Sequence, residues 1–301
     1  MTEEITRIGV VGSGIMGAGV AEVCGKAGRD VIVAVSSEAS LETGPRRLER
    51  SLGRAVDKGR ISREQGEEAL RRVSFTTDRG ALYDRQLVIE AVSEDEPLKL
   101  QIFAELDKIV DDPETILASI TSSIPIVRLA RATTRPDRVV GVHFFNPVPV
   151  LPLVEIVDSV LTDSAVSARA ESFVSGTLGK TVIKAPDRAG FVVNAVLFPY
   201  LLSAIRMVDS GFATAETIDK GMTLGCSHPM GPLRLADLIG LDTVLAAAQA
   251  MYEESKEPHY APPTLLLRLV EGGLLGRKSG RGFYPYDAPR QQQSTSHTPG
   301  S

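Results

Sequence analysis

The sequence predicts an α/β fold, in which a doubly wound, mostly parallel sheet is followed by an all-helical domain. Three observations lead to this prediction. Short apolar runs alternate with helical patterns over roughly the first 186 residues, the first run opens into a glycine-rich turn, and no convincing strand follows Gly190. We therefore expect a sheet domain at 1–186, a helical domain at 187–286 and a disordered tail at 287–301.

The first element is a β-branched run at Ile5–Val11, which is dense enough for a strand buried on both faces. A Gly-x-Gly-x-x-Gly turn follows it, and an Ala/Gly/Val-rich helix then runs to about Ala27. A second apolar strand is expected at Val31–Val35. A glycine turn between a strand and a helix, with another strand after it, is typical of a Rossmann-type dinucleotide site.

Each glycine of this turn has a physical role in such a site. Gly12 permits the tight turn, Gly14 lets the backbone approach a diphosphate, and Gly17 lets the helix pack closely on the strand. Free N–H groups at the start of the helix favour binding of the diphosphate. We take these glycines as cofactor-binding candidates, together with Ile15 and Met16 between them.

The choice between NAD and NADP stays open on the residues alone. Sites that prefer NAD usually end the second strand with a carboxylate that binds the adenosine ribose. Here the strand ends at Val35 and Ser36, our candidates for the ribose site, and the first carboxylate is Glu38. No arginine follows at once to bind a 2′-phosphate, because Arg46 and Arg47 come a helical turn or two later. We expect NAD, with NADP not excluded.

A charged helical arm precedes the third strand. Its first helix is expected within Glu38–Lys58, although Gly44 and Pro45 favour a start at Pro45, and its second helix is capped by Ser62. The arm is either a solvated helical hairpin or a cover beside the substrate.

Glu94 and Lys99 follow the fourth strand, and ligands of parallel sheets bind outside the carboxyl ends of strands. Glu94 and Lys99 therefore either line the cofactor crevice or have no role in binding. In the second case, Glu94 is an acidic residue at the start of a helix and Lys99 is a basic residue on the surface. The other expected elements are strands at Arg72–Thr76, Leu87–Ala91, Ile116–Ser119 and Thr181–Ile183, and helices at Pro97–Val110, after Pro125 and at 162–179.

Two further strands, near Val139–Phe145 and Leu153–Val157, are expected to form a hairpin, because prolines between them exclude a helix. A reversal near Pro149 would place His143 opposite Glu155. A carboxylate beside a histidine fixes its tautomer and favours a general base. The other interpretation is a structural histidine with a surface glutamate, and the residues alone leave both open.

The second domain begins with a long apolar helix at Phe191–Ser210, in which Asn194 is a polar exception. So apolar a helix needs partners on most sides, which favours a homodimer through this domain. The net charge of −5 gives no indication of a nucleic-acid partner, and no run approaches the roughly 18 apolar residues of a membrane span. An acidic start without a signal peptide, and only Cys24 and Cys226, indicate a reduced, cytoplasmic protein. We expect no metal site.

The chain resembles the 3-hydroxyacyl-CoA dehydrogenase family, most closely its short bacterial 3-hydroxybutyryl-CoA members. The resemblance runs from about Ile5 to Tyr286 and rests on VGSGIMGAGVAE, IEAVSEDEPLK, TSSIPI, GVHFFNPVPVLPLVEIV, GFVVNAVL, GCSHPMGPLRLADLIGLDT and GRKSGRGFY. It implies oxidation of a 3-hydroxyacyl-CoA to a 3-ketoacyl-CoA by hydride transfer to a nicotinamide, in fatty acid or butanoate metabolism. The family usually has an acid where Val35 stands and an asparagine where Ile120 stands.

The resemblance also implies roles for individual residues. His143 takes the position of the catalytic base, and Glu155 that of its carboxylate partner. Ser122 and Asn194 match the hydroxyl and amide that position the substrate. The positions that contact the CoA moiety are matched by Ser51 and Lys58.

Two other classes of function are compatible with the same residues. One is a dehydrogenase of a free or carrier-protein-bound hydroxy acid, because a phosphopantetheine-linked substrate could use the same groove. The other is a cofactor-binding relative without turnover, although the intact His143, Glu155, Ser122 and Asn194 speak against it.

Overall fold

The computed structural model describes residues 4–287, so the predicted tail lies, beyond Asp287, outside the described residues. The chain divides into two compact units, Met1–Val192 and Val193–Ser301, and each is described by itself. The division follows Val192, a few residues later than the boundary near 187 that we expect from the sequence.

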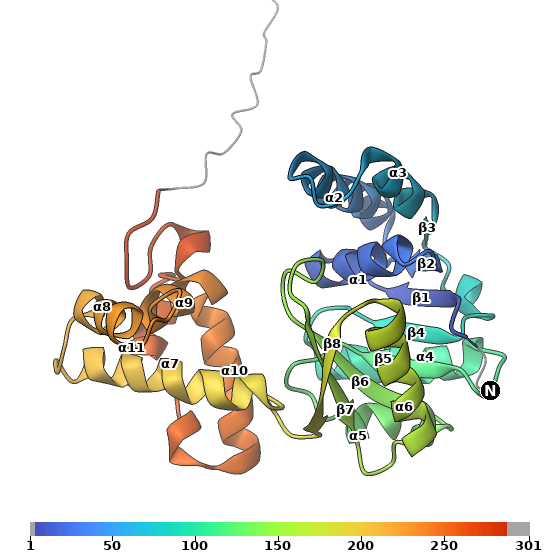
Figure 1. The fold of residues 1–301 in the computed structure, drawn as a ribbon. Helices are drawn as coiled ribbons and strands as arrows, with labels where there is room; N and C mark the ends of the chain where they lie inside the picture. The colour runs from blue at the N-terminus through green and yellow to red at the C-terminus, as the bar shows by residue number, and fades with distance from the viewer. Residues whose placement is uncertain (1–3, 288–301) are drawn as a thin grey trace, which may run out of the picture. The chain divides into compact units, whose positions relative to one another are not determined.

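The first unit is built on one eight-stranded sheet with the order β3-β2-β1-β4-β5-β6-β7-β8 (Figure 1). All neighbouring strands are parallel except β6 and β7, which pair antiparallel. The predicted doubly wound, mostly parallel sheet is therefore confirmed. The strands are β1 (Arg7–Val11), β2 (Asp30–Ala34), β3 (Val73–Thr76), β4 (Leu87–Glu90), β5 (Ile116–Ser119), β6 (Val139–Phe144), β7 (Leu153–Asp158) and β8 (Thr181–Pro186).

Helices cover both faces of this sheet, because its central strands are apolar on both sides. One apolar cluster joins one face to α1 (Ile15–Lys26) and α6 (Ser164–Ser172), which continues as η3 (Phe173–Thr177). A second cluster joins the other face to α4 (Glu96–Ile109) and α5 (Ile126–Ala130). The predicted arm consists of α2 (Glu38–Asp57) and α3 (Arg63–Arg71), which pack on α1 (Figure 1). The short turns η1 (Arg79–Leu82) and η2 (Pro136–Arg138) complete the unit.

The prediction that the first arm helix begins at Pro45 is wrong, because α2 already begins at Glu38. Ser37 caps it, and its side chain accepts a hydrogen bond from the Ser40 N–H. Pro45 lies inside the helix at the cost of one backbone hydrogen bond. Gly44 does not break the helix but serves packing, since a Cβ there would lie 2.8 Å from the Phe75 ring.

The described residues of the second unit form helices and two isolated β-bridges, which confirms the predicted all-helical domain. Two buried carboxylates tie its last segment to the helices. Asp237 accepts hydrogen bonds from the backbone N–H groups of Phe283 and Tyr284, and Asp219 accepts one from the Tyr284 hydroxyl at 2.8 Å. The elements are α7 (Val193–Asp209), α8 (Ala215–Gly225), α9 (Pro232–Ile239), α10 (Leu241–Ser255), η4 (Pro258–Tyr260), α11 (Thr264–Glu271) and η5 (Arg277–Ser279).

Across residues 4–287, no single helix is both long and apolar enough to cross a membrane. The pair α9 and α10 meets the length and composition criteria only when taken together, and it is bent by 95°.

Candidate active site

The hairpin of β6 and β7 places His143 directly opposite Glu155, as the sequence predicts. The His143 Nδ1 lies 2.6 Å from the Glu155 Oε2, and only 6% of His143 and none of Glu155 is exposed. A carboxylate only accepts hydrogen bonds, so this pairing assigns the proton of the neutral imidazole to Nδ1. The other ring nitrogen, Nε2, is therefore left to accept a proton.

The segment Gly190–Val192, which ends the first unit, packs against this pair. The Phe191 ring meets the His143 ring edge-on at 5.3 Å, and the Val192 N–H donates to the Glu155 Oε1 at 3.0 Å. Phe191 has a positive φ of 46°, which is uncommon for a residue other than glycine. With this backbone conformation, the Phe191 ring contacts the imidazole while the Val192 N–H binds the Glu155 carboxylate. The two contacts fix the orientation of the dyad.

Ser122 lies in the turn after β5, the strand next to β6, and so at the same carboxyl edge as His143. Glu94 organises this turn, because its Oε1 accepts from the backbone N–H groups of Ser122 at 3.0 Å and Ser123 at 3.1 Å. The Ser122 Oγ is 3.5 Å from the same oxygen, a contact too long to hold the hydroxyl firmly. The backbone carbonyl of Ser122 accepts a hydrogen bond from the Gly190 N–H, which links the turn to the segment beside the dyad.

Lys99 is fully buried and points toward two carboxylates. Its Nζ lies 2.7 Å from the Glu90 Oε1 and 3.5 Å from the Glu94 Oε2. Burial alone raises the pKa of Glu94, but Lys99 and the hydrogen bonds of the Ser122 turn lower this pKa overall. Glu94 therefore stays ionised and holds the turn. The cofactor-binding role of Glu94 and Lys99 stays a prediction, and the sequence pattern did not reveal Glu90 as the third member of the group.

The glycine turn fits the diphosphate of a dinucleotide. Gly12 has a φ of 106°, and a Cβ there would lie 2.7 Å from the Ala91 carbonyl oxygen. A Cβ on Gly17 would lie 2.1 Å from the Gly12 carbonyl oxygen, so both glycines are required by packing. By contrast, a Cβ on Gly14 would meet no atom within 4 Å and would project into open space. The N-terminus of α1 has no side-chain cap and no acidic residue in its first turn, so its N–H groups remain suited to an anion.

A cavity of about 370 Å³ opens beside this turn. The predicted residues Gly12, Gly14, Val35 and Ser36 line it, whereas Met16 packs against the core. Two arginines line it as well: Arg79, which sequence reasoning missed, and Arg47, which it placed a helical turn or two too far along the chain. The other lining residues are Val11, Ser13, Ala34, Ser40, Thr43, Ala91, Val92, Ser93, Leu98 and Ile102.

A second hollow, of about 390 Å³, lies between the arm helix α2, the helix α1 and the loop of the β6–β7 hairpin. The predicted Ser51 lines it, as does Ile15, whereas Lys58 caps the end of α2 and is not among its lining residues. Three arginines of α2, spaced so that they share one helix face, line it as well: Arg47, Arg50 and Arg54. This spacing was readable in the sequence and is the signal that could have found them. The hollow is therefore strongly cationic.

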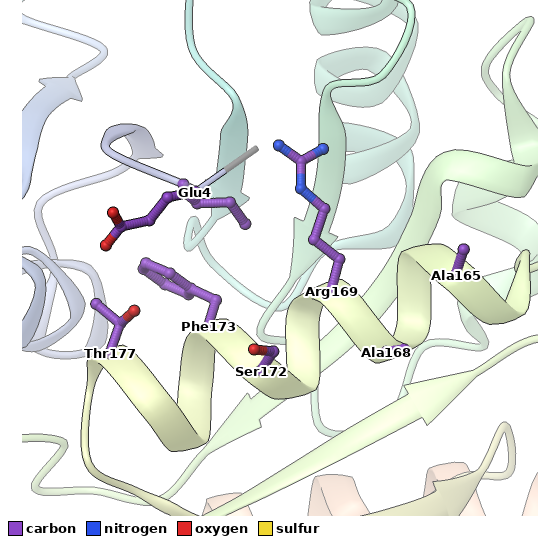
Figure 2. Close-up of a pocket in the computed structure, with 8 residues that line it drawn as sticks. Glu4, Ala165, Ala168, Arg169, Ser172, Phe173 and Thr177 are labelled. Carbon is purple, nitrogen blue, oxygen red and sulfur yellow. The ribbon is translucent and has the colours of Figure 1, made fainter. Parts of the chain in front are cut away.

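A third hollow, of about 360 Å³, lies beside the segment that precedes β1, at the amino end of this strand. It is lined by the chain around Glu4 and by α6 and η3, including Arg169 and Phe173 (Figure 2). None of the predicted site residues of the described chain lines it.

Asn194 belongs to the second unit, where it stands in the first turn of α7. Its role as a substrate-positioning residue stays a prediction. Ile120, where the resembled family usually has asparagine, is 9% exposed and belongs to an apolar cluster of the sheet.

Comparisons with known proteins agree with this geometry. Residues 7–188 match the NAD binding domain of 3-hydroxyacyl-CoA dehydrogenase, and residues 190–286 match its C-terminal domain. A 3-hydroxybutyryl-CoA dehydrogenase of Mycobacterium tuberculosis is 59% identical over 286 residues, which are 95% of this chain and 100% of that protein.

Solved structures are similar over the same range. The crystal structure of M. tuberculosis FadB2 has a TM-score of 0.93 at 59% identity, covering 95% of this chain and 100% of that one. That of (S)-3-hydroxybutyryl-CoA dehydrogenase from Ralstonia eutropha has a TM-score of 0.90 at 42% identity, covering 94% and 100%. Because the two domain matches together span nearly all of the described residues, the chain belongs to the 3-hydroxyacyl-CoA dehydrogenase family.

Proposed function

We propose that this protein is an NAD-dependent dehydrogenase that interconverts 3-hydroxybutyryl-CoA and acetoacetyl-CoA, in fatty acid or butanoate metabolism. The observation that carries the proposal is the buried His143–Glu155 pair at the carboxyl edge of a sheet whose glycine turn fits a dinucleotide. The relatives of similar sequence that carry this enzyme name support the choice of substrate.

NAD, when bound, supplies the nicotinamide that accepts the hydride from C3 of the substrate. The glycine turn of Gly12, Gly14 and Gly17 would hold its diphosphate. His143 accepts the proton of the 3-hydroxyl at Nε2, because Glu155 keeps the other proton on Nδ1 and stabilises the imidazolium that forms. From the family resemblance, we assign to each of Ser122 and Asn194 a role in positioning the substrate. Such positioning matters because reacting atoms must approach to about 3–3.5 Å.

The cationic hollow favours CoA over a free hydroxy acid or a carrier-protein substrate. CoA carries a diphosphate and a 3′-phosphate, and arginine binds phosphate groups through paired N–H donors. Arg50, Ser51 and Arg54 line this hollow next to the hairpin loop that follows His143. A phosphopantetheine arm has a single phosphate, and a free acid has none, so each offers fewer anionic groups to Arg50 and Arg54 than CoA does.

The test compares initial rates of NADH oxidation with acetoacetyl-CoA, acetoacetyl-pantetheine and acetoacetate. The proposal expects kcat/KM to fall at least about tenfold from the CoA thioester to the pantetheine thioester, since binding of the remote phosphates contributes to the reaction. Equal values for these two thioesters would favour the carrier-protein alternative. No turnover of any substrate, despite normal NADH binding, would favour a cofactor-binding protein without activity.

We also propose that the protein is a homodimer through its second unit. Large apolar residues of that unit are exposed to solvent: Val196 is 72%, Phe212 77% and Leu224 74% exposed. Sedimentation velocity at micromolar concentration should give the mass of a dimer, and a monomer alone would contradict this.

We further assign the protein to the cytoplasm, which agrees with its two free cysteines, Cys24 and Cys226.

A further inference from the structure

The end of β2 is the place where a dinucleotide site distinguishes NAD from NADP. A carboxylate there binds the ribose hydroxyls of NAD, whereas a nearby arginine accommodates the 2′-phosphate of NADP. In this protein the cavity wall after β2 consists of Val35 and Ser36. The first carboxylate after them, Glu38, stands in the first turn of α2 and is not among the lining residues.

Arg79 stands next to this position, although it is far from it in sequence. The strands β2 and β3 are parallel neighbours with Ala34 opposite Thr76, and the Val35 N–H donates to the Thr76 carbonyl at 2.9 Å. Arg79 follows Thr76 by one short turn, so it reaches the same edge of the sheet and lines the same cavity as Ser36.

The charges around the cavity favour an additional anion. Two arginines, Arg79 and Arg47, are among its lining residues, and no aspartate or glutamate is among those that the structure describes. Arg79 is paired with Glu105 of α4, which fixes the direction of the side chain. A guanidinium has five N–H donors, so this pairing leaves donors for a phosphate. Asp78, the nearest acid in sequence, accepts a hydrogen bond from the Gly80 N–H at 2.8 Å and caps η1.

Arg47 has a different place. One of its N–H groups donates to the Ser13 carbonyl in the glycine turn, so it stands toward the diphosphate that both cofactors share. Of the two lining arginines, Arg79 is therefore the one that stands beside the end of β2.

We propose that Arg79, with the hydroxyl of Ser36, binds the adenosine 2′-phosphate of NADP(H), so that the enzyme uses NADPH as well as NADH. This inference rests on the dinucleotide site of the proposed function, but not on the identity of the acyl substrate. It also revises the expectation from the sequence, in which no arginine was close enough to bind this phosphate.

The first test is direct binding to the wild-type protein, without any acyl substrate. NADH and NADPH are titrated by their own fluorescence, which the absence of tryptophan leaves undisturbed. Bound NADH is then displaced by 5′-AMP or by 2′,5′-ADP, which differ only in the 2′-phosphate. We expect 2′,5′-ADP to compete about tenfold better than 5′-AMP, and NADPH to bind at least as tightly as NADH, because the same 2′-phosphate distinguishes both pairs.

The second test is Arg79→Gln, with Arg128→Gln as the matched control. Arg128 also pairs with a glutamate, Glu96, but is 58% exposed and does not line the cavity. Arg79→Gln should raise the Kd of NADPH by about ten- to a hundredfold and change that of NADH by less than about threefold. Arg128→Gln should leave both values unchanged, and Arg79→Lys should recover part of the NADPH affinity.

The inference is overturned if 2′,5′-ADP competes no better than 5′-AMP, a result that does not depend on any variant folding. Equal weakening of both cofactors by Arg79→Gln would also overturn it. Normal binding of NADH with no binding of NADPH refutes this inference alone, whereas failure of both cofactors to bind refutes the dinucleotide site itself.

Discussion

The substitution Glu155→Gln tests how the dyad works, because it removes one charge and changes almost no volume. The carboxylate accepts two hydrogen bonds that the structure defines, from the His143 Nδ1 at 2.6 Å and from the Val192 N–H at 3.0 Å. A glutamine has one oxygen and one NH₂ group, so it can accept only one of them. The amide must therefore choose between two orientations.

In one orientation the amide oxygen faces Val192, and the NH₂ group donates to the His143 Nδ1. The ring proton then moves to Nε2, the atom that must accept the substrate proton. In the other orientation the NH₂ group faces the Val192 N–H, which leaves two buried donors in contact at a cost of about 1–3 kcal/mol. The first orientation is therefore favoured by about five- to a hundredfold, since 1.4 kcal/mol corresponds to a factor of ten.

We therefore expect Glu155→Gln to lower kcat by about 10²–10⁴-fold, the usual contribution of a positioned general base. The assay is steady-state reduction of acetoacetyl-CoA by NADH, with NADH affinity measured separately. Glu114→Gln is the control, because Glu114 pairs with Arg138 on the surface before β5 and is 58% exposed. Its kcat should stay within about twofold of wild type.

The tautomer can be observed as well. The chain has four histidines, so the side-chain nitrogen signals of labelled protein can be assigned by substitution. The wild type should carry its proton on the His143 Nδ1, and Glu155→Gln should carry it on Nε2. A kcat within about threefold of wild type, or an unchanged tautomer, would refute the reasoning about the dyad.

Three further predictions concern the sites around the dyad. Val35→Asp places a carboxylate in the cavity after β2, so the ratio of kcat/KM for NADH over NADPH should rise at least about tenfold, or about 1.4 kcal/mol; an unmoved ratio would show that this residue does not select the cofactor. The lowered pKa of Glu94 stabilises the folded state above the ordinary glutamate pKa of about 4.3, and this contribution is lost as the pH falls through the folded-state pKa. The urea midpoint of Glu94→Gln should therefore fall less on acidification than that of wild type, and parallel pH profiles would contradict this. Tyr284→Phe removes the hydrogen bond to Asp219 and should lower the free energy of unfolding by about 1.5–3 kcal/mol, whereas Tyr83→Phe, at a 53% exposed position, should change the urea midpoint little.

Local patterns were sufficient to predict the sheet and the opposition of His143 and Glu155, but not that this pair is catalytic. The glycine turn identifies its own strand and helix, because the steric role of Gly12 and Gly17 is local. The opposition of His143 and Glu155 was predictable because the two strands are joined by a short proline-rich reversal, so that the register follows from distance along the chain. The roles assigned to these residues came from the family resemblance rather than from the pattern.

Features that depend on neighbours far apart in sequence were not predictable in this way. Arg79 reaches the cavity only because β3 lies beside β2, and Lys99 is buried only because Glu90 on β4 faces it. The start of α2 was misplaced for a different reason. The cap by Ser37 stabilises the first turn more than Pro45 disrupts the helix, and a rule that treats proline as a start signal does not weigh the two effects.

The most direct test of the central claim, that His143 is the general base, is the turnover of His143→Gln with acetoacetyl-CoA and NADH at neutral pH. The account predicts a fall in kcat of about 10²–10⁴-fold, with the Kd of NADH nearly unchanged because the imidazole is not among the residues that line the dinucleotide cavity. A kcat within about threefold of wild type, measured on a variant that binds NADH normally, would contradict it and remove His143 from the mechanism.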